Sequence, residues 1–143
     1  DWPQLGFDDG SWAAGPAPLG FGDGDEATLI PSGTPTSRPL TSYFRHVFVI
    51  DDPAAVSGLV ARLVRDDGAL VWLNGVEVIR TNLPATGTIG YSVLATGAGF
   101  AGPSIVATGL PRTGPRSEFH ARGDACLREV ARALEARGRR AAA

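Results

Sequence analysis

Lysine and methionine are absent from this chain, and cysteine occurs only once, at Cys126. A single cysteine excludes an intrachain disulfide and a cysteine-based zinc site. No apolar run approaches the ~20 residues that a bilayer-spanning helix needs, so we expect no membrane partner. The formal net charge of −2 also lacks the excess of basic residues by which proteins bind phosphate backbones. We therefore expect no nucleic-acid partner either.

Glycine and proline, by contrast, are abundant, with 19 and 11 residues among 143. Together with 43% hydrophobic residues, they indicate one globular domain with many tight turns. Charge is divided unevenly along the chain. Eleven acidic residues and five arginines give residues 1–110 a charge of −6, whereas eight arginines and four acidic residues give residues 111–143 a charge of +4. This shift predicts a domain over 1–108 and a separate segment over 109–143.

The pattern of side chains predicts an all-β fold. Residues 1–40 show isolated anchors among Gly, Pro and Asp, which is typical of loops pinned onto a sheet. Residues 42–50 are rich in aromatic and β-branched side chains and predict a strand that ends at an Asp-Asp-Pro turn. Further strands are predicted over 59–64 and 88–94.

The strongest local signal is an Asn-Gly pair between two apolar runs over 69–79. Asn74 and Gly75 can both adopt the positive φ of a type I′ turn, which predicts a two-residue hairpin. A regular ladder would pair Leu73–Val76, Trp72–Glu77, Val71–Val78 and Leu70–Ile79. One face would then be aliphatic and face the core, with Leu73, Val71, Val76 and Val78, and Trp72 and Glu77 would lie on the other.

The C-terminal part has a different pattern. Residues 109–123 are rich in Pro, Arg and Gly without periodicity, and an apolar stripe at helical spacing over 125–137 predicts a short helix. A lone helix of this length is marginal in water. We therefore expect 109–143 to lie outside the β domain, either because a linker begins there or because the gene changes reading frame.

Five blocks of sequence, in a fixed order over residues 7–95, carry a resemblance to a known family: Phe7-Asp8-Asp9-Gly10-Ser11-Trp12, Gly15–Asp25, Thr41–Arg45, Arg65–Val78 and Arg80–Pro84. Together they resemble the galactose-binding-like jelly-roll module of large secreted bacterial proteins. In such proteins the module stands beside metallophosphoesterase, spore-coat-kinase-like or lamin-tail domains. The resemblance implies a β-sandwich, an extracellular or cell-surface location and other domains of the same polypeptide as partners.

The chain departs from that family at both ends. The family's first strand segment, upstream of Trp2, is absent, and residues 97–143 do not match its closing strand. We therefore expect a jelly-roll sandwich that is incomplete at both ends and carries a C-terminal helical tail.

One group of side chains could bind a polysaccharide or other glycan. Carbohydrate recognition needs an exposed aromatic platform beside oriented polar groups. Trp72 is such a platform, with Glu77 opposite it in the hairpin and Arg80 and Asn82 following. The alternative is that Trp72 is half-buried beneath the N-terminal loop.

No catalytic constellation is evident, since His46 falls within a predicted strand and His120 within the irregular tail. We expect no cofactor, except for a structural calcium ion that Asp23, Asp25 and Glu26 could hold on their Gly-rich loop. The alternative for these three acids is a solvated turn.

These observations favour a non-catalytic accessory module that binds carbohydrate. Two alternatives stay open. The chain could be a purely structural spacer domain, or it could be appended to a metallophosphoesterase whose active site lies outside it. Fold resemblance alone does not separate them.

Overall fold

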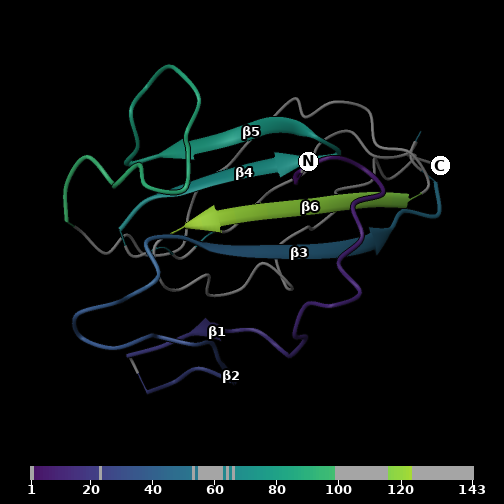
Figure 1. Ribbon diagram of the computed structural model, residues 1–143. Helices are drawn as coiled ribbons and strands as arrows, with labels where there is room; N and C mark the ends of the chain where they lie inside the picture. The colour runs from purple at the N-terminus through teal and green to yellow at the C-terminus, as the bar shows by residue number, and fades with distance from the viewer. Residues whose placement is uncertain are drawn as a thin grey trace, which may run out of the picture.

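The computed structural model describes residues 2–22, 24–52, 54, 63, 65, 67–98 and 116–123, the last as a backbone strand. These residues contain six strands in two sheets and no helix (Figure 1). The predicted all-β class is confirmed at this level. None of the described residues forms a helix that is long and apolar enough to cross a membrane. The helix predicted over 125–137, and the strand predicted over 59–64 except for Leu63, lie outside the described residues.

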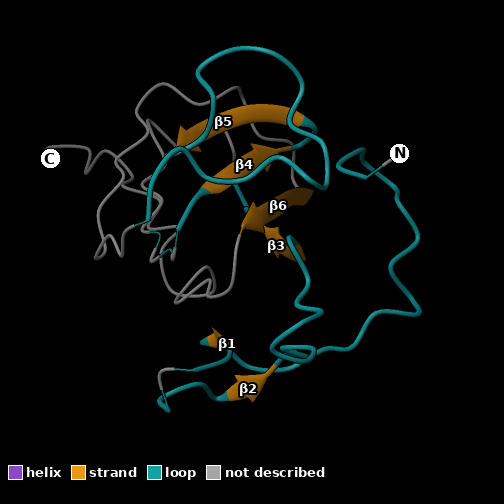
Figure 2. Cartoon of the chain, turned by 60° about the vertical axis from the view of Figure 1, so that its left-hand side comes forward, coloured by secondary structure: helices purple, strands orange, loops and turns teal. Residues whose placement is uncertain are grey.

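The larger sheet has four strands: β3 (Ser42–Val49), β4 (Ala69–Leu73), β5 (Val76–Thr81) and β6 (Arg116–Gly123). Their order is β3-β6-β4-β5, and all neighbours are antiparallel. The smaller sheet pairs β1 (Leu19–Gly20) with β2 (Thr28–Leu29) in parallel. Both views place this pair on the β3 side of the larger sheet (Figure 2).

The strand predicted over 42–50 is confirmed as β3. Its aromatic and β-branched residues suit a half-buried pleated surface. Phe44 and Phe48 pack against the core cluster, whereas Tyr43 and Val49 are exposed. The strand ends before the Asp-Asp-Pro segment, as expected for a proline that has no N–H to pair.

The expectation that residues 109–143 lie outside the sheet is wrong for Arg116–Gly123. These residues form β6, which pairs along its whole length with β3 and through its second half with β4. The reason is that pairing supplies backbone hydrogen bonds whatever the side-chain pattern. Strand β6 fills the space between β3 and β4, whose facing edges would otherwise stay open.

The predicted hairpin turn is confirmed. Asn74 has φ 51° and Gly75 has φ 79°, and Leu73 lies opposite Val76 directly beyond the turn. Trp72 lies opposite Glu77, also as predicted. Both positive φ values give the right-handed twist that the flanking strands share, so the turn and the strands support each other.

The predicted ladder is wrong beyond Trp72, because a β-bulge shifts the register there. Val71 pairs with Ile79 and Leu70 with Arg80, so Val78 is the extra residue. The bulge turns Ile79 toward the core, where it is 5% exposed. A regular ladder would have placed Val78 there.

The core lies on one face of the larger sheet and consists of Leu63, Ala69, Val71 and Ile79. Leu73 is also buried, as predicted, and Val78 packs partly against the core cluster. The prediction that Val76 belongs to the core is wrong, since its side chain is 51% exposed. Val76 begins the edge strand directly after the turn, where a side chain has neighbours on one side only.

Residues 88–94 are not a strand, contrary to prediction. They form a loop with a turn in which the Val93 N–H donates to the Gly90 carbonyl. The apolar residues of this segment do not mark the buried face of a strand. Ile89 is buried, whereas Tyr91 and Leu94 are exposed. This loop covers part of the sheet face opposite the core.

Candidate functional site

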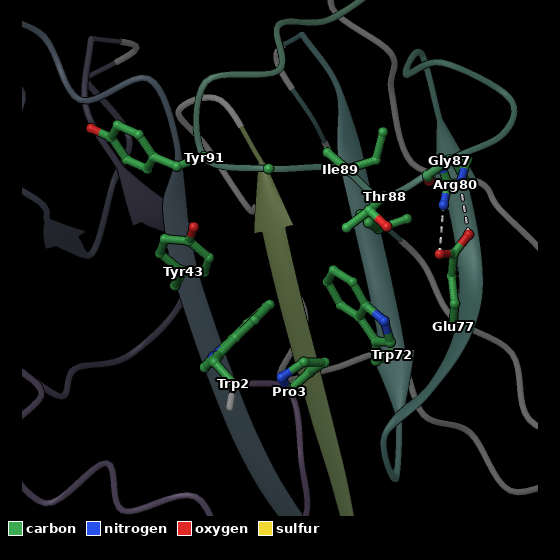
Figure 3. A pocket seen from close by; sticks show the side chains of 12 residues that line it. Trp2, Pro3, Tyr43, Trp72, Glu77, Arg80, Gly87, Thr88, Ile89 and Tyr91 are labelled. Atoms are coloured by element: carbon green, nitrogen blue, oxygen red, sulfur yellow. Dashed lines mark hydrogen bonds and ion pairs between the residues drawn. The ribbon is translucent and has the colours of Figure 1, made fainter.

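A pocket of about 520 Å³ lies on the sheet face opposite the core cluster. This volume falls within the roughly 300–1,000 Å³ that small-molecule sites occupy. The described residues of its floor come from strands β3, β4 and β5, with β6 running between β3 and β4, and two loop segments supply its walls (Figure 3). The lining residues are Trp2, Pro3, Tyr43, Leu70, Trp72, Glu77, Arg80, Gly87, Thr88, Ile89, Gly90 and Tyr91.

Three aromatic rings meet at one side of the pocket. The Trp2 ring lies between the other two, with its centroid 4.8 Å from that of Tyr43 and 5.1 Å from that of Trp72. The interplanar angles of 73° and 84° are edge-to-face arrangements, which suit the ring quadrupoles. Leu70 is buried in the floor beside them at 1% exposure. This side of the pocket is therefore apolar and rigid.

The other side of the pocket carries a two-pronged ion pair. Arg80 Nε lies 2.7 Å from Glu77 Oε1, and Arg80 Nη2 lies 2.7 Å from Glu77 Oε2 (Figure 3). Residues three apart in a regular strand point to opposite faces. The bulge at Val78 removes this mismatch and brings both side chains to the pocket face. The hydrogen bond to Glu77 raises the pKa of Arg80, so the arginine stays charged.

Arg80 also holds one end of the loop wall. Its Nη1 donates to the Pro84 carbonyl at 2.9 Å and to the Gly87 carbonyl at 3.2 Å. At the other end, the Thr41 hydroxyl donates to the Tyr91 carbonyl at 2.8 Å, and the Leu40 N–H donates to the Tyr91 hydroxyl at 3.3 Å. The wall over 87–91 is thus tied to the sheet at both ends.

The N-terminal wall is fixed through Arg45 of β3. The Arg45 side chain is 5% exposed; its Nη1 lies 3.0 Å from Asp9 Oδ2 and donates to the Phe7 carbonyl at 2.6 Å. Its guanidinium also lies 5.9 Å from the centre of the Phe7 ring. Trp12 packs edge-on against the same ring. Both walls are therefore held in place before any ligand arrives, which lowers the entropic cost of binding.

The structure brings three of the four predicted carbohydrate-site residues together. Trp72, Glu77 and Arg80 all line the pocket. Asn82 does not line it. With φ 52°, Asn82 donates from Nδ2 to the Asp67 carbonyl at 3.0 Å and accepts from the Thr96 hydroxyl at 2.8 Å. Asn82 therefore joins the 82–97 segment to the start of β4.

The alternative prediction, that Trp72 is half-buried beneath the N-terminal loop, also holds in part. Its side chain is half-buried, and the N-terminal segment covers it through Trp2. Trp72 nevertheless still lines the pocket. It is therefore both a packing residue and a pocket residue.

Sequence reasoning did not place the two walls in the site. Trp2, Pro3 and Tyr43 come from the first segment and from β3, and residues 87–91 come from a loop predicted as a strand. Alternation along β3 gave a usable signal for Tyr43, which lies on the face opposite Phe44. No local pattern indicates which loop folds over which sheet face.

The predicted calcium site is described in part. Asp23 lies outside the described residues, and the Glu26 carboxylate accepts a hydrogen bond from the Gly24 N–H at 2.9 Å. Within the described part of the chain, no group of three His, Cys, Asp or Glu residues is placed to hold a metal ion. Calcium binding here stays a prediction.

Comparison of the chain with protein-family models, with curated proteins and with solved structures finds no match.

Proposed function

We propose that this chain is a non-catalytic jelly-roll module of the galactose-binding-like type, from a larger secreted protein, and that it binds carbohydrate in the pocket above β3, β4 and β5. The observation that carries the proposal is the placement of Trp72 beside the Glu77–Arg80 pair in one preformed pocket. A sugar ring has apolar C–H faces and a polar rim. It therefore needs aromatic surface and paired hydrogen-bonding groups side by side.

The pairing of Arg80 supports a sugar over a phosphate-bearing ligand at this side of the pocket. Phosphate recognition uses arginines whose donors are free to form bidentate pairs. Arg80, the basic residue among the described lining, already forms such a pair with Glu77. The remaining residues of the described lining are aromatic, aliphatic or small.

Filling the pocket from its exposed wall tests the proposal. Thr88 lines the pocket and is exposed, so Thr88→Trp should occupy the space that a sugar needs without disturbing the core. We expect wild type to be retained on at least one glycan of an array and Thr88→Trp to lose that retention, with unchanged thermal unfolding. Trp72→Ala is a poorer test, because it also removes the neighbour of Trp2.

Thr86→Trp is the matched control. Thr86 is exposed on the same loop and does not line the pocket, so this variant should bind as wild type does. Equal loss in both variants, or retention by Thr88→Trp, would place binding elsewhere on the chain. Absence of retention by wild type on any glycan would instead favour the spacer role.

A further inference from the structure

Strand β6 crosses the floor of the pocket between β3 and β4. Its register sets Arg122 opposite Tyr43 of β3 and opposite Leu70 of β4, and both of these residues line the pocket. Residues that lie directly opposite each other in antiparallel strands belong to the same face of the sheet. Arg122 is therefore a residue of the pocket face. Figure 3 shows β6 passing between Tyr43 and Trp72.

The register extends this row across all four strands. It runs from Tyr43 of β3 through Arg122 of β6 and Leu70 of β4 to Arg80 of β5. Neighbouring strands lie about 4.8 Å apart, so the backbone positions of Arg122 and Arg80 are about 10 Å apart, one on each side of Leu70. The row thus places one arginine on either side of a buried leucine in the pocket floor.

Arg80 and Arg45, the described arginines of this face, already have carboxylate partners. Both prongs of the pair between Arg80 and Glu77 measure 2.7 Å, and Arg80 Nη1 donates to two carbonyls of the loop wall. The Arg45 side chain is 5% exposed and lies 3.0 Å from Asp9. Neither arginine can offer a ligand the two-pronged contact by which arginine binds an anionic group strongly. That contact falls to the position of Arg122.

We propose that the pocket prefers acidic sugars, which carry a carboxylate or a sulfate group, to their neutral counterparts, and that Arg122 sets this preference. The inference rests on the proposed carbohydrate function and names its ligand class. The sugar ring lies against Trp72, its hydroxyl groups donate to Glu77, and its acidic group lies at the position of Arg122. Glu77 belongs to β5, two strands away from β6, so its charge is distant from that group.

The first test compares sugars that differ only in the acidic group. The affinity of the wild-type chain is measured by calorimetry for matched oligosaccharides that end in galactose, in galacturonic acid or in sulfated galactose. A charge-assisted contact with arginine should make at least one acidic sugar bind about tenfold or more tightly than the neutral one. The two acidic sugars show whether the preferred group is a carboxylate or a sulfate.

Arg122→Gln should remove this preference. It takes away the charge at the centre of the floor, so the affinity for the acidic sugar should fall to that for the neutral one, which stays unchanged. Arg116→Gln is the matched control. Arg116 belongs to the same strand and the same face, but it lies opposite Val49, about 20 Å along β6 from Arg122 and beyond the residues that pair with β4. This variant should keep the wild-type preference.

Equal affinity of wild type for the neutral and acidic sugars would overturn the inference and leave carbohydrate binding standing, whereas binding of none of them would overturn both. Equal loss of the preference in the two variants would also overturn it, because the net charge alone would then be the cause. If Arg122→Gln fails to fold, Arg122→Lys replaces it. Lysine keeps the charge without the two-pronged contact, so the preference should shrink, and an unchanged preference would exclude Arg122 as its source.

Discussion

Asn74 and Gly75 show how two residues can decide a local structure. Both adopt positive φ, at 51° and 79°, in the turn between β4 and β5. Asparagine tolerates this region through its short polar side chain, and glycine enters it without steric cost. The turn sets Trp72 opposite Glu77 two pairs back along the ladder. Its geometry therefore reaches the pocket, although neither turn residue lines it.

Gly75→Val should destabilise the chain by about 2 kcal/mol, because a β-branched residue is strained at φ 79°. A Cβ at this position would come no closer than 3.5 Å to the Gln4 side chain, so the cost should come from the backbone and not from a clash. Urea unfolding of wild type and variant measures the difference.

Two further substitutions isolate the backbone effect. Gly75→Asn should cost less than Gly75→Val, since asparagine is tolerated at positive φ. Gly90→Val should cost little, because a Cβ at Gly90 would have nothing within 4 Å and its φ is not positive. A loss at Gly90 equal to that at Gly75 would show that φ is not the cause.

The bulge in β5 determines which side chains share a face. Because Val78 is skipped by the ladder, Glu77 and Arg80 point to the pocket while Ile79 points to the core. Deletion of Val78 removes the skipped residue but keeps the pairs of Val71 with Ile79 and of Leu70 with Arg80. The deletion should therefore fold and bind glycan as wild type does. The expected loss of stability is about 1 kcal/mol, from the partial packing of Val78.

The matched control adds one residue to β5 instead of removing one, by inserting an alanine between Ile79 and Arg80. It has to turn Arg80 away from the pocket or disrupt the end of the ladder, so glycan retention should be lost. Thermal unfolding followed by circular dichroism, together with glycan retention, distinguishes the two variants. If the deletion loses retention and the insertion keeps it, the bulge does not organise the site.

The elements that could be predicted from sequence are those with local causes. Strand β3 follows from its aromatic and β-branched run, and the β4–β5 turn follows from Asn-Gly. The bulge has no such cause, because a regular ladder would have placed Val78 in the core as acceptably as Ile79. Only the wider packing of the sheet selects one over the other.

Strand β6 and the pocket walls could not be predicted for a related reason. Residues 116–123 read RSEFHARG, with few β-formers and no alternation, yet they pair on both sides. The loop wall over 87–91 depends on hydrogen bonds from Arg80 and Thr41, which are distant in sequence or in another element. Three of the four predicted site residues line the pocket, because the hairpin sets Trp72 opposite Glu77 and the bulge turns Arg80 to the same face.

At the scale of the whole molecule, the larger sheet depends on its last strand. β6 pairs with all eight residues of β3 and all five of β4. A chain cut after residue 108 lacks β6 and leaves two strand edges facing an empty space. We expect this truncated chain to lose cooperative thermal unfolding and to aggregate.

A chain cut after Gly123 is the control, because it keeps every strand pairing of the described sheet. It should unfold cooperatively near the wild-type temperature. Cooperative unfolding of the 1–108 chain at that temperature would mean that β6 is not needed for the sheet and that the domain ends before it.

The position of β6 also bears on when the protein can fold. Residues 42–81 supply three strands of the larger sheet, but the strand that joins β3 to β4 begins only at residue 116. Synthesis proceeds from the N-terminus, so the ribosome releases β3 and β4 well before their shared neighbour exists. During that interval both edges are open to other chains, and pairing over such long separations is slow. The nascent protein should therefore rely on chaperones until residues 116–123 have been made.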